Sequence, residues 1–247
     1  AIKSCGVDIL GMFIVIDGAD GTGKSTVLNT WEDFLKQEGY SLFSLKNFWK
    51  ENNAHPDEAE WEKSDVIISA EPTYAPMGRI IREELIRESD VAYPPEAIAQ
   101  AFSLDRLILY HKVILPALKA KKIIIQDRSV TTSLVYQAVQ SAALTLDRLA
   151  GLPGNQLALE HAPDYLIVLE LPVEKAMERL QGRDTKKDNA IFEHPEIIKK
   201  NMRAFHNPDF CRRLEQKGVQ IIYFDTSDKI DIMREKALNL FKKITKL

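Results

Sequence analysis

Short runs of apolar residues alternate along the chain with longer stretches in which apolar positions recur with the period of a helix. The apolar runs do not alternate regularly with polar residues, a pattern typical of strands that are buried on both faces. This succession predicts an α/β fold in which helices cover both faces of a parallel sheet. The five predicted strands are Met12–Asp17, Val66–Ala70, Ile123–Asp127, Tyr165–Leu171 and Gln220–Phe224.

Helical periodicity predicts seven helices between and after these strands. The last of them is amphipathic and closes the chain, and no internal repeat or low-complexity tract interrupts the pattern. The predicted helices are Lys24–Gln37, Met77–Glu88, Pro95–Leu118, Thr132–Ala143, Val173–Gln181, His194–Lys217 and Ile230–Lys246.

We expect residues 40–64 to form an insertion within one domain that spans residues 1–247. The segment joins the first predicted helix to the second predicted strand, and it is much longer than an ordinary connection of about 2–6 residues. It is a polar run that contains Trp49 and Trp61. We expect these tryptophans to anchor the segment to the body of the protein or to a partner subunit, rather than to touch a substrate.

Composition and charge limit the classes of function. Hydrophobic residues make up 45% and charged residues 28% of the 247 positions, values ordinary for a globular protein with a buried core. The net charge of -3 gives no general attraction to nucleic acid, so an anionic ligand needs a local cluster of cations. No apolar run approaches the ~20 residues that span a bilayer. Cys5 and Cys211 lack metal-ligand spacing, so we expect free thiols and a cytoplasmic location.

The strongest motif is a phosphate-binding loop that directly follows the first predicted strand and opens the first predicted helix. Its pattern G-x-x-x-x-G-K-[ST] is matched in full from Gly18 to Ser25. Backbone N–H groups of such a loop face the phosphates of ATP, Lys24 reaches the β- and γ-phosphates, and Ser25 supplies a hydroxyl ligand for Mg²⁺. A plain glycine-rich turn is the weaker alternative. The expected ATP-binding residues here are Gly18, Ala19, Asp20, Gly21, Thr22, Gly23, Lys24, Ser25 and Thr26.

A second motif, Asp127-Arg128-Ser129, follows the third predicted strand at the carboxyl edge of the sheet, where ligands of open α/β sheets bind. Asp127 can orient Mg²⁺ through water, and Arg128 can bridge the donor and acceptor phosphates. The alternative is a structural Asp–Arg pair that caps the next helix. We expect Lys24, Asp127 and Arg128 to be catalytic.

From Met12 to about Asp225 the chain resembles the thymidylate kinase family. The resemblance implies a P-loop kinase fold with a five-stranded parallel sheet of order 2-3-1-4-5, a short lid, and a homodimer. It also implies ATP-dependent phosphorylation of dTMP to dTDP with Mg²⁺, without nucleic acid or membrane partners. The stretches that carry it are FIVIDGADGTGKST, AEPTYAPMGRIIREEL, AFSLDR, IIIQDRSVTTSLVYQ and PDYLIVLELPVEKAMERLQGR.

The resemblance also implies roles for residues in the acceptor site. Asp20 would accept a hydrogen bond from the deoxyribose 3′-hydroxyl, Phe102 would stack on thymine, and Arg128 would hold the dTMP phosphate. Arg106 would donate to thymine O4, and its spacing of four from Phe102 places both side chains on one helix face. Without Arg106 and the downstream motif, Phe102 would instead be interpreted as an aromatic residue of the core. The remaining residues expected at the substrate are Glu71, Thr132, Ser133 and Tyr136.

The resemblance places a lid at residues 179–193. Arg179, Arg183, Lys186 and Lys187 crowd this segment, which is typical either of a solvated charged face or of mobile charge that closes over a transferring phosphoryl group. Family members without an arginine in the phosphate loop supply one from the lid. In this chain Thr22, rather than an arginine, follows the second glycine of the loop. Arg183 is therefore the expected catalytic arginine, and Arg179 and Arg183 are expected to bind ATP. The adenine-flanking loop would be Asp225-Thr226-Ser227.

Departures from the family pattern keep other functions open. Ala70, Thr73 and Tyr74 stand where family members offer an arginine to the acceptor phosphate, and Ser129 replaces the usual aromatic. Asp-Arg-Ser fits a deoxynucleoside kinase, in which Glu71 would act as general base on a 5′-hydroxyl. A kinase of another nucleoside monophosphate and a non-catalytic ATP-binding module are the further alternatives.

Overall fold

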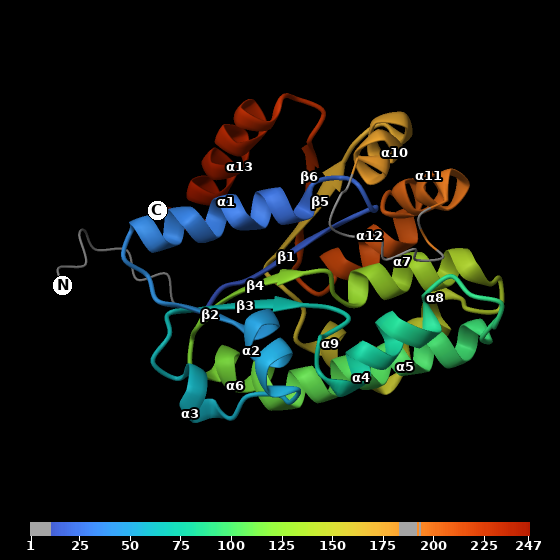
Figure 1. The fold of residues 1–247 in the computed structure, drawn as a ribbon, viewed down its shortest axis with the longest axis horizontal. Coiled ribbons are helices and arrows are strands. Elements are labelled where there is room, and N and C mark those ends of the chain that lie inside the picture. Colours follow the sequence, from blue (N-terminus) through green and yellow to red (C-terminus); the bar gives the residue numbers. More distant parts are fainter. Residues whose placement is uncertain (1–10, 183–191, 193) are drawn as a thin grey trace.

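The computed structural model describes residues 11–182, 192 and 194–247. Its sheet is parallel throughout and has the order β2-β3-β4-β1-β5-β6 (Figure 1). The five predicted strands correspond to β3-β4-β1-β5-β6, so their predicted order is confirmed, and β2 extends one edge. The strands are β1 (Phe13–Gly18), β2 (Leu42–Ser44), β3 (Val66–Ala70), β4 (Ile123–Asp127), β5 (Tyr165–Glu170) and β6 (Gln220–Asp225).

Strand β1 is central because it pairs with β4 on one side and β5 on the other. Its alternate residues enter the two cores of the protein: Phe13 and Val15 belong to one hydrophobic cluster, and Ile14 and Ile16 to the other. The apolar run therefore reflects burial on both faces, as predicted. The same prediction is wrong for β6, which is partly exposed because it lies at the edge and pairs with β5 alone among the described strands.

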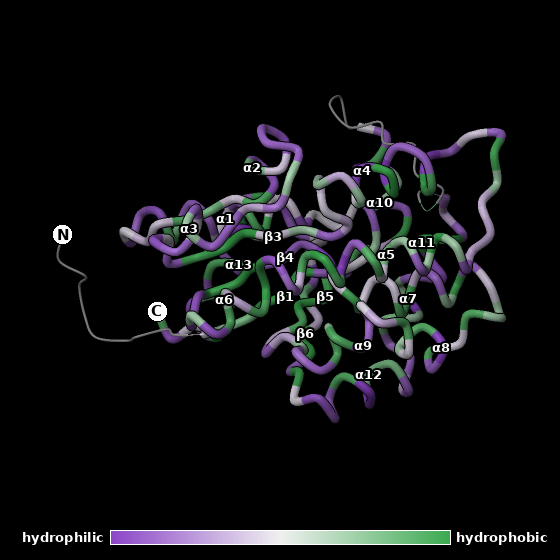
Figure 2. Tube along the Cα trace, turned by 90° about the horizontal axis from the view of Figure 1, so that it is seen from below, coloured by the Kyte–Doolittle hydropathy of each residue, from purple (hydrophilic) through white to green (hydrophobic). Residues whose placement is uncertain are grey.

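Helices α1 (Lys24–Gln37) and α13 (Ile230–Thr245) cover one face of the sheet (Figure 1). Trp31 and Phe241 stack between them with ring centroids 4.9 Å apart. The opposite face is covered by helices that include α5 (Pro95–Leu109), α7 (Val130–Gln140), α9 (Pro153–Glu160) and α12 (Pro208–Glu215). Hydrophobic and hydrophilic positions both occur along the outer helices (Figure 2), which matches their half-buried packing.

One of the predicted helices is divided in the structure. The segment predicted as His194–Lys217 breaks where the Asn207 side chain accepts hydrogen bonds from the first turn of α12, whose first residue is a proline. Periodicity missed the short helices α8 (Leu146–Ala150) and α9. None of the described helices combines the length and the apolar character needed to cross a membrane. Outside residues 40–64, the remaining α-helices are α4 (Pro76–Ile80), α6 (Leu115–Lys119), α10 (Val173–Gln181) and α11 (Pro195–Ala204). Two segments, η1 (Ile81–Leu85) and η2 (Tyr110–Ile114), are π-helical.

Residues 40–64 form β2, then α2 (Leu45–Asn52) and α3 (Glu58–Trp61). Trp49 and Trp61 are almost completely buried and join the same core cluster as Phe13. The tryptophans therefore anchor the segment to the body of the protein. Because β2 is parallel to β3, helix α2 begins at the carboxyl edge of the sheet, beside the end of β3.

Candidate functional site

The phosphate loop connects β1 to α1 at the carboxyl edge of the sheet. Gly18 has φ 131°, and a Cβ on it would lie only 2.6 Å from the backbone oxygen of Leu169 in β5. A side chain at this position would collide with the neighbouring strand. Thr22 closes the loop by donating from Oγ1 to the backbone oxygen of Ala19 at 2.8 Å. Together these contacts fix the turn that leads into α1.

The Lys24 side chain folds back into the loop. Its Nζ donates to the backbone oxygens of Gly18 and Ala19, at 2.9 Å each. Burial, and to a lesser extent nearby Arg128, lower the pKa of Lys24 to about 8, while surrounding carboxylates oppose the shift. The loop therefore presents a buried cation next to Ser25, whose side chain is exposed at the start of α1.

Affinity for ATP is expected to fall as the pH rises above about 8, because Lys24 loses its proton there. The pKa lies below its ordinary value of 10.5, so the ammonium expected to attract the triphosphate is present below this pKa and lost above it. Titrations of ATP binding from neutral to alkaline pH measure this. A Lys24→Met variant should bind ATP weakly without that alkaline fall. A wild-type affinity that stays constant through this range would contradict the assignment.

Asp17 organises the edge of the sheet between the two motifs. Its buried carboxylate accepts hydrogen bonds from Thr131 Oγ1 at 2.5 Å, from Thr132 Oγ1 at 2.7 Å and from the backbone N–H of Gly18 at 2.8 Å. Burial raises the pKa of Asp17, and Arg128 and the two hydroxyls oppose that rise. Asp17 is not among the predicted site residues, although a charged residue that ends an apolar strand is a usable signal. Thr132, expected at the base, is bonded here to Asp17.

Arg128 brings the two motifs together. It has φ 66°, and its Nη2 forms an ion pair of 2.7 Å with Asp20 Oδ1. Nη1 lies 3.6 Å from Asp17 Oδ1, and the guanidinium carbon lies 5.1 Å from the ring centroid of Tyr136. The Tyr136 hydroxyl in turn donates to Asp20 Oδ2 at 3.4 Å. The structure thus gathers Asp20, Arg128 and Tyr136, three residues that were predicted at the substrate from distant parts of the sequence.

The expected Mg²⁺ ligands fit a hard cation that prefers oxygen. Asp127 Oδ1 is buried and has no hydrogen-bond partner among the described residues. Ser25 Oγ lies on the exposed first turn of α1. Asp127 and Ser25 would hold Mg²⁺, which would neutralise phosphate charge when bound.

Arg106 lies at the centre of a buried network that links α5, α7 and α9 with the segment after β3. It is 1% exposed, and its Nη2 is 2.5 Å from Glu71 Oε2 and 3.0 Å from Ser133 Oγ. Its Nε donates to Glu71 at 2.8 Å, and its Nη1 donates to Asn155 Oδ1 of α9. Burial raises the pKa of Glu71 to about 7, and Arg106 opposes this rise. The donors predicted to reach thymine are therefore engaged by protein groups in this structure.

Phe102 lies one helical turn before Arg106 on α5. Its ring is 6% exposed and packs in a small cluster with Ile81, Ile98 and Ala101. Asp105 lies between Phe102 and Arg106 in the sequence. Its carboxylate accepts hydrogen bonds from the backbone N–H and Oγ1 of Thr73 at 2.7 and 2.6 Å. Asp105 therefore ties α5 to the segment after Glu71. Neither Asp105 nor Asn155 was predicted, because each is recognisable only by a partner far away in sequence.

The structure describes only part of the predicted lid. Arg183, Lys186 and Lys187 lie outside the described residues. Arg179 donates from Nη2 to the backbone oxygen of Thr226 at 2.7 Å, so α10 touches the loop expected to flank adenine. A Cβ on Gly23 would lie 3.5 Å from Arg179 Nη1, which places this guanidinium beside the phosphate loop.

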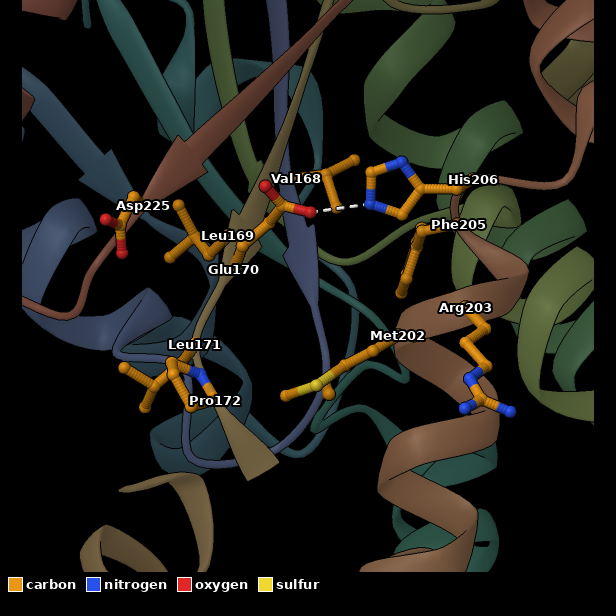
Figure 3. Close-up of a pocket in the computed structure, with 11 residues that line it drawn as sticks. Val168, Leu169, Glu170, Leu171, Pro172, Met202, Arg203, Phe205, His206 and Asp225 are labelled. Carbon is orange, nitrogen blue, oxygen red and sulfur yellow. Dashed lines mark hydrogen bonds and ion pairs between the residues drawn. The ribbon is translucent and has the colours of Figure 1, made fainter. Parts of the chain in front are cut away.

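A cavity of about 450 Å³ lies between the ends of β5 and β6 and helix α11. His206 Nε2 and Glu170 Oε1 approach to 2.6 Å at its wall (Figure 3). The cavity meets the phosphate loop only at Ala19, and it reaches the loop expected to flank adenine at Asp225. The lining residues are Ala19, Val168, Leu169, Glu170, Leu171, Pro172, Met202, Arg203, Phe205, His206 and Asp225.

Comparison with known proteins identifies similar sequences over most of the chain. The family model described as thymidylate kinase matches residues 58–237. A probable thymidylate kinase of Thermococcus onnurineus is 33% identical over 199 residues, which cover 77% of this chain and 82% of that protein. A thymidylate kinase of an Exiguobacterium species is 26% identical over 233 residues, which cover 93% of each chain.

Proposed function

Because the chain belongs to the thymidylate kinase family, we propose that it transfers the γ-phosphoryl group of ATP to dTMP and forms dTDP and ADP. The observation that carries the proposal is the convergence of Lys24, Asp20 and Arg128 at one edge of the sheet. Such an arrangement places a donor-phosphate cation beside groups suited to an acceptor nucleotide.

On the donor side, the loop N–H groups and Lys24 bind the β- and γ-phosphates, and Ser25 and Asp127 hold Mg²⁺. Arg179 lies between the loop and the Thr226 segment, a position that supports its contact with ATP. Arg183 remains our proposed lid arginine. The enzyme supplies position and positive charge, since the acceptor phosphate is already an anion and needs no strong general base.

On the acceptor side, Asp20 receives the 3′-hydroxyl of the deoxyribose and Arg128 holds the phosphate. Phe102 forms the wall against thymine, beside Arg106, while Thr132, Ser133 and Tyr136 line the same region from α7. Both Glu71 oxygens accept hydrogen bonds, from Arg106 and from Gln126 Nε2 at 3.1 Å. Glu71 is thus positioned to orient Arg106 rather than to take a proton from a nucleoside.

An ADP-release assay with Mg²⁺ and ATP tests the proposal against dTMP, dUMP, dCMP, dGMP, AMP and thymidine. We expect a clear preference for dTMP. Turnover of thymidine but not dTMP would assign the chain to the nucleoside kinases, with Glu71 as the general base. Binding of ATP without turnover of any acceptor would instead indicate a non-catalytic module.

We further propose a cytoplasmic homodimer. Large hydrophobic side chains are exposed on the helices that flank the sheet, including Ile80 and Leu104 at 50% and 47%. A second copy of the chain would cover such positions. Light scattering coupled to size exclusion measures the oligomeric state, and a monomer at all concentrations would contradict this proposal.

A further inference from the structure

The acceptor phosphate requires more positive charge than the predicted residues offer. A nucleoside monophosphate presents a phosphate dianion, whereas Arg128 is already paired with Asp20 and approaches Asp17. Arg106 is paired with Glu71 in the same way. Each of these arginines is thus balanced by protein carboxylates before the nucleotide binds. Additional cations at the acceptor end of the site would supply the missing charge.

Three cations surround Tyr74, two residues after Pro72. Arg82 lies over the ring with its guanidinium carbon 4.1 Å from the centroid, and it donates to the backbone oxygens of Thr73 and Pro72. Lys46 Nζ and Lys50 Nζ lie 5.3 and 5.4 Å from the same centroid. Within the described residues, none of the three cations is ion-paired with a carboxylate at hydrogen-bonding distance. We call them the Tyr74 cation cluster.

The Tyr74 cation cluster lies at the same edge of the sheet as the two motifs. Lys46 is in the first turn of α2, which starts where β2 ends beside β3. It also lies close enough to Glu32 of α1 to oppose the rise that burial gives the pKa of that carboxyl. At the other end, the backbone N–H of Glu71 donates to the backbone oxygen of Asp127 at 2.9 Å, which brings the segment leading to Tyr74 beside Arg128.

We infer that Lys46 and Lys50, together with Arg82, bind the phosphate of the acceptor monophosphate, an inference that rests on the proposed function. The segment 40–64 then has a functional role, because it carries two lysines to the acceptor end of the site. These cations would bind the acceptor phosphate in place of the arginine that other family members have at the positions of Ala70, Thr73 or Tyr74. The ligand chemistry is a phosphate monoester dianion attached to the nucleoside held by the acceptor pocket.

A Lys46→Ala/Lys50→Ala double variant tests the inference. Its KM for dTMP should rise about tenfold, because two ion pairs with the phosphate are lost, while the KM for ATP should remain unchanged. Direct binding should weaken for dTMP but not for thymidine, which lacks the phosphate. The matched control is Lys36→Ala/Lys63→Ala, which removes the same charge from exposed positions outside the cluster. A Lys46→Arg/Lys50→Arg variant should restore dTMP affinity.

The possible outcomes separate this inference from the proposed function. A wild-type protein that does not phosphorylate dTMP would overturn both. An active wild type with equal dTMP affinity in the double variant and the control would overturn only the role of the lysines. Equal loss of dTMP and thymidine binding would do so as well, because it would show that the substitutions disturb the pocket rather than remove a phosphate contact.

Discussion

Replacing Lys24 by alanine is expected to lower kcat for phosphoryl transfer by at least about 10³-fold, because the donor phosphates lose the cation nearest to the transferring group. The substitution should leave the fold intact. Lys24 Nζ contributes only two hydrogen bonds to loop carbonyls, and its removal relieves the cost of a buried charge. The ADP-release assay measures the loss of activity, and thermal unfolding measures the fold.

The control for Lys24 is Lys36→Ala, on the last turn of the same helix. Its side chain is 58% exposed and should affect neither turnover nor stability by more than a small amount. Near-wild-type activity in Lys24→Ala would overturn the proposed phosphoryl-transfer mechanism. A melting temperature that collapses with the activity would show that the loop, rather than the chemistry, had been lost.

Replacing Arg106 by alanine is expected to destabilise the protein by about 3–5 kcal/mol, the cost of breaking a buried ion pair by removing one partner. The substitution leaves Glu71 buried without its cation and removes donors from Asn155 and Ser133. Unfolding by urea measures this change. An exposed arginine on α4, Arg79, provides the control, and Arg79→Ala should change stability by less than about 0.5 kcal/mol.

A double-mutant cycle with Glu71→Gln and Arg106→Met separates the ion pair from its surroundings. We expect the two changes to be non-additive by more than about 1 kcal/mol, because the residues share one network. If Arg106 served only as a contact to the base, its replacement would raise the KM for dTMP without changing the free energy of unfolding. That result would refute the structural role given to Arg106 here.

The sequence was most informative where chemistry depends on neighbouring residues. The loop from Gly18 to Ser25 combines residue types, spacing and a strand–loop–helix context, so its place between β1 and α1 could be predicted. ATP as its ligand stays a prediction of the same motif. The continuous apolar runs predicted the buried strands. Periodicity could not reveal that β6 lies at the edge, because both faces of this strand still pack against a core, through Ile221 on one side and Ile222 on the other, so its apolar residues do not alternate.

Long-range partners set the limit of prediction for the site. Asp17, Asp105 and Asn155 are ordinary polar residues in the sequence, and each gains its role from a threonine or an arginine that the fold brings to it. Arg106 was predicted as a base contact from its place in a motif. Its burial by Glu71, Asn155 and Ser133 depends on α7, α9 and the segment after β3, so no local pattern could show it.

The central position of β1 has a consequence for how the protein acquires its activity. Its partners are far away in sequence: Phe13 is aligned with Ile124 of β4, about 110 residues later, and Ile14 with Tyr165 of β5. Parallel pairings over such distances make folding slow, since the entropy of closing long loops is lost before the contacts form. The phosphate loop follows directly after this strand. A chain that binds nucleotide is therefore one in which β1 has already paired with β4 and β5.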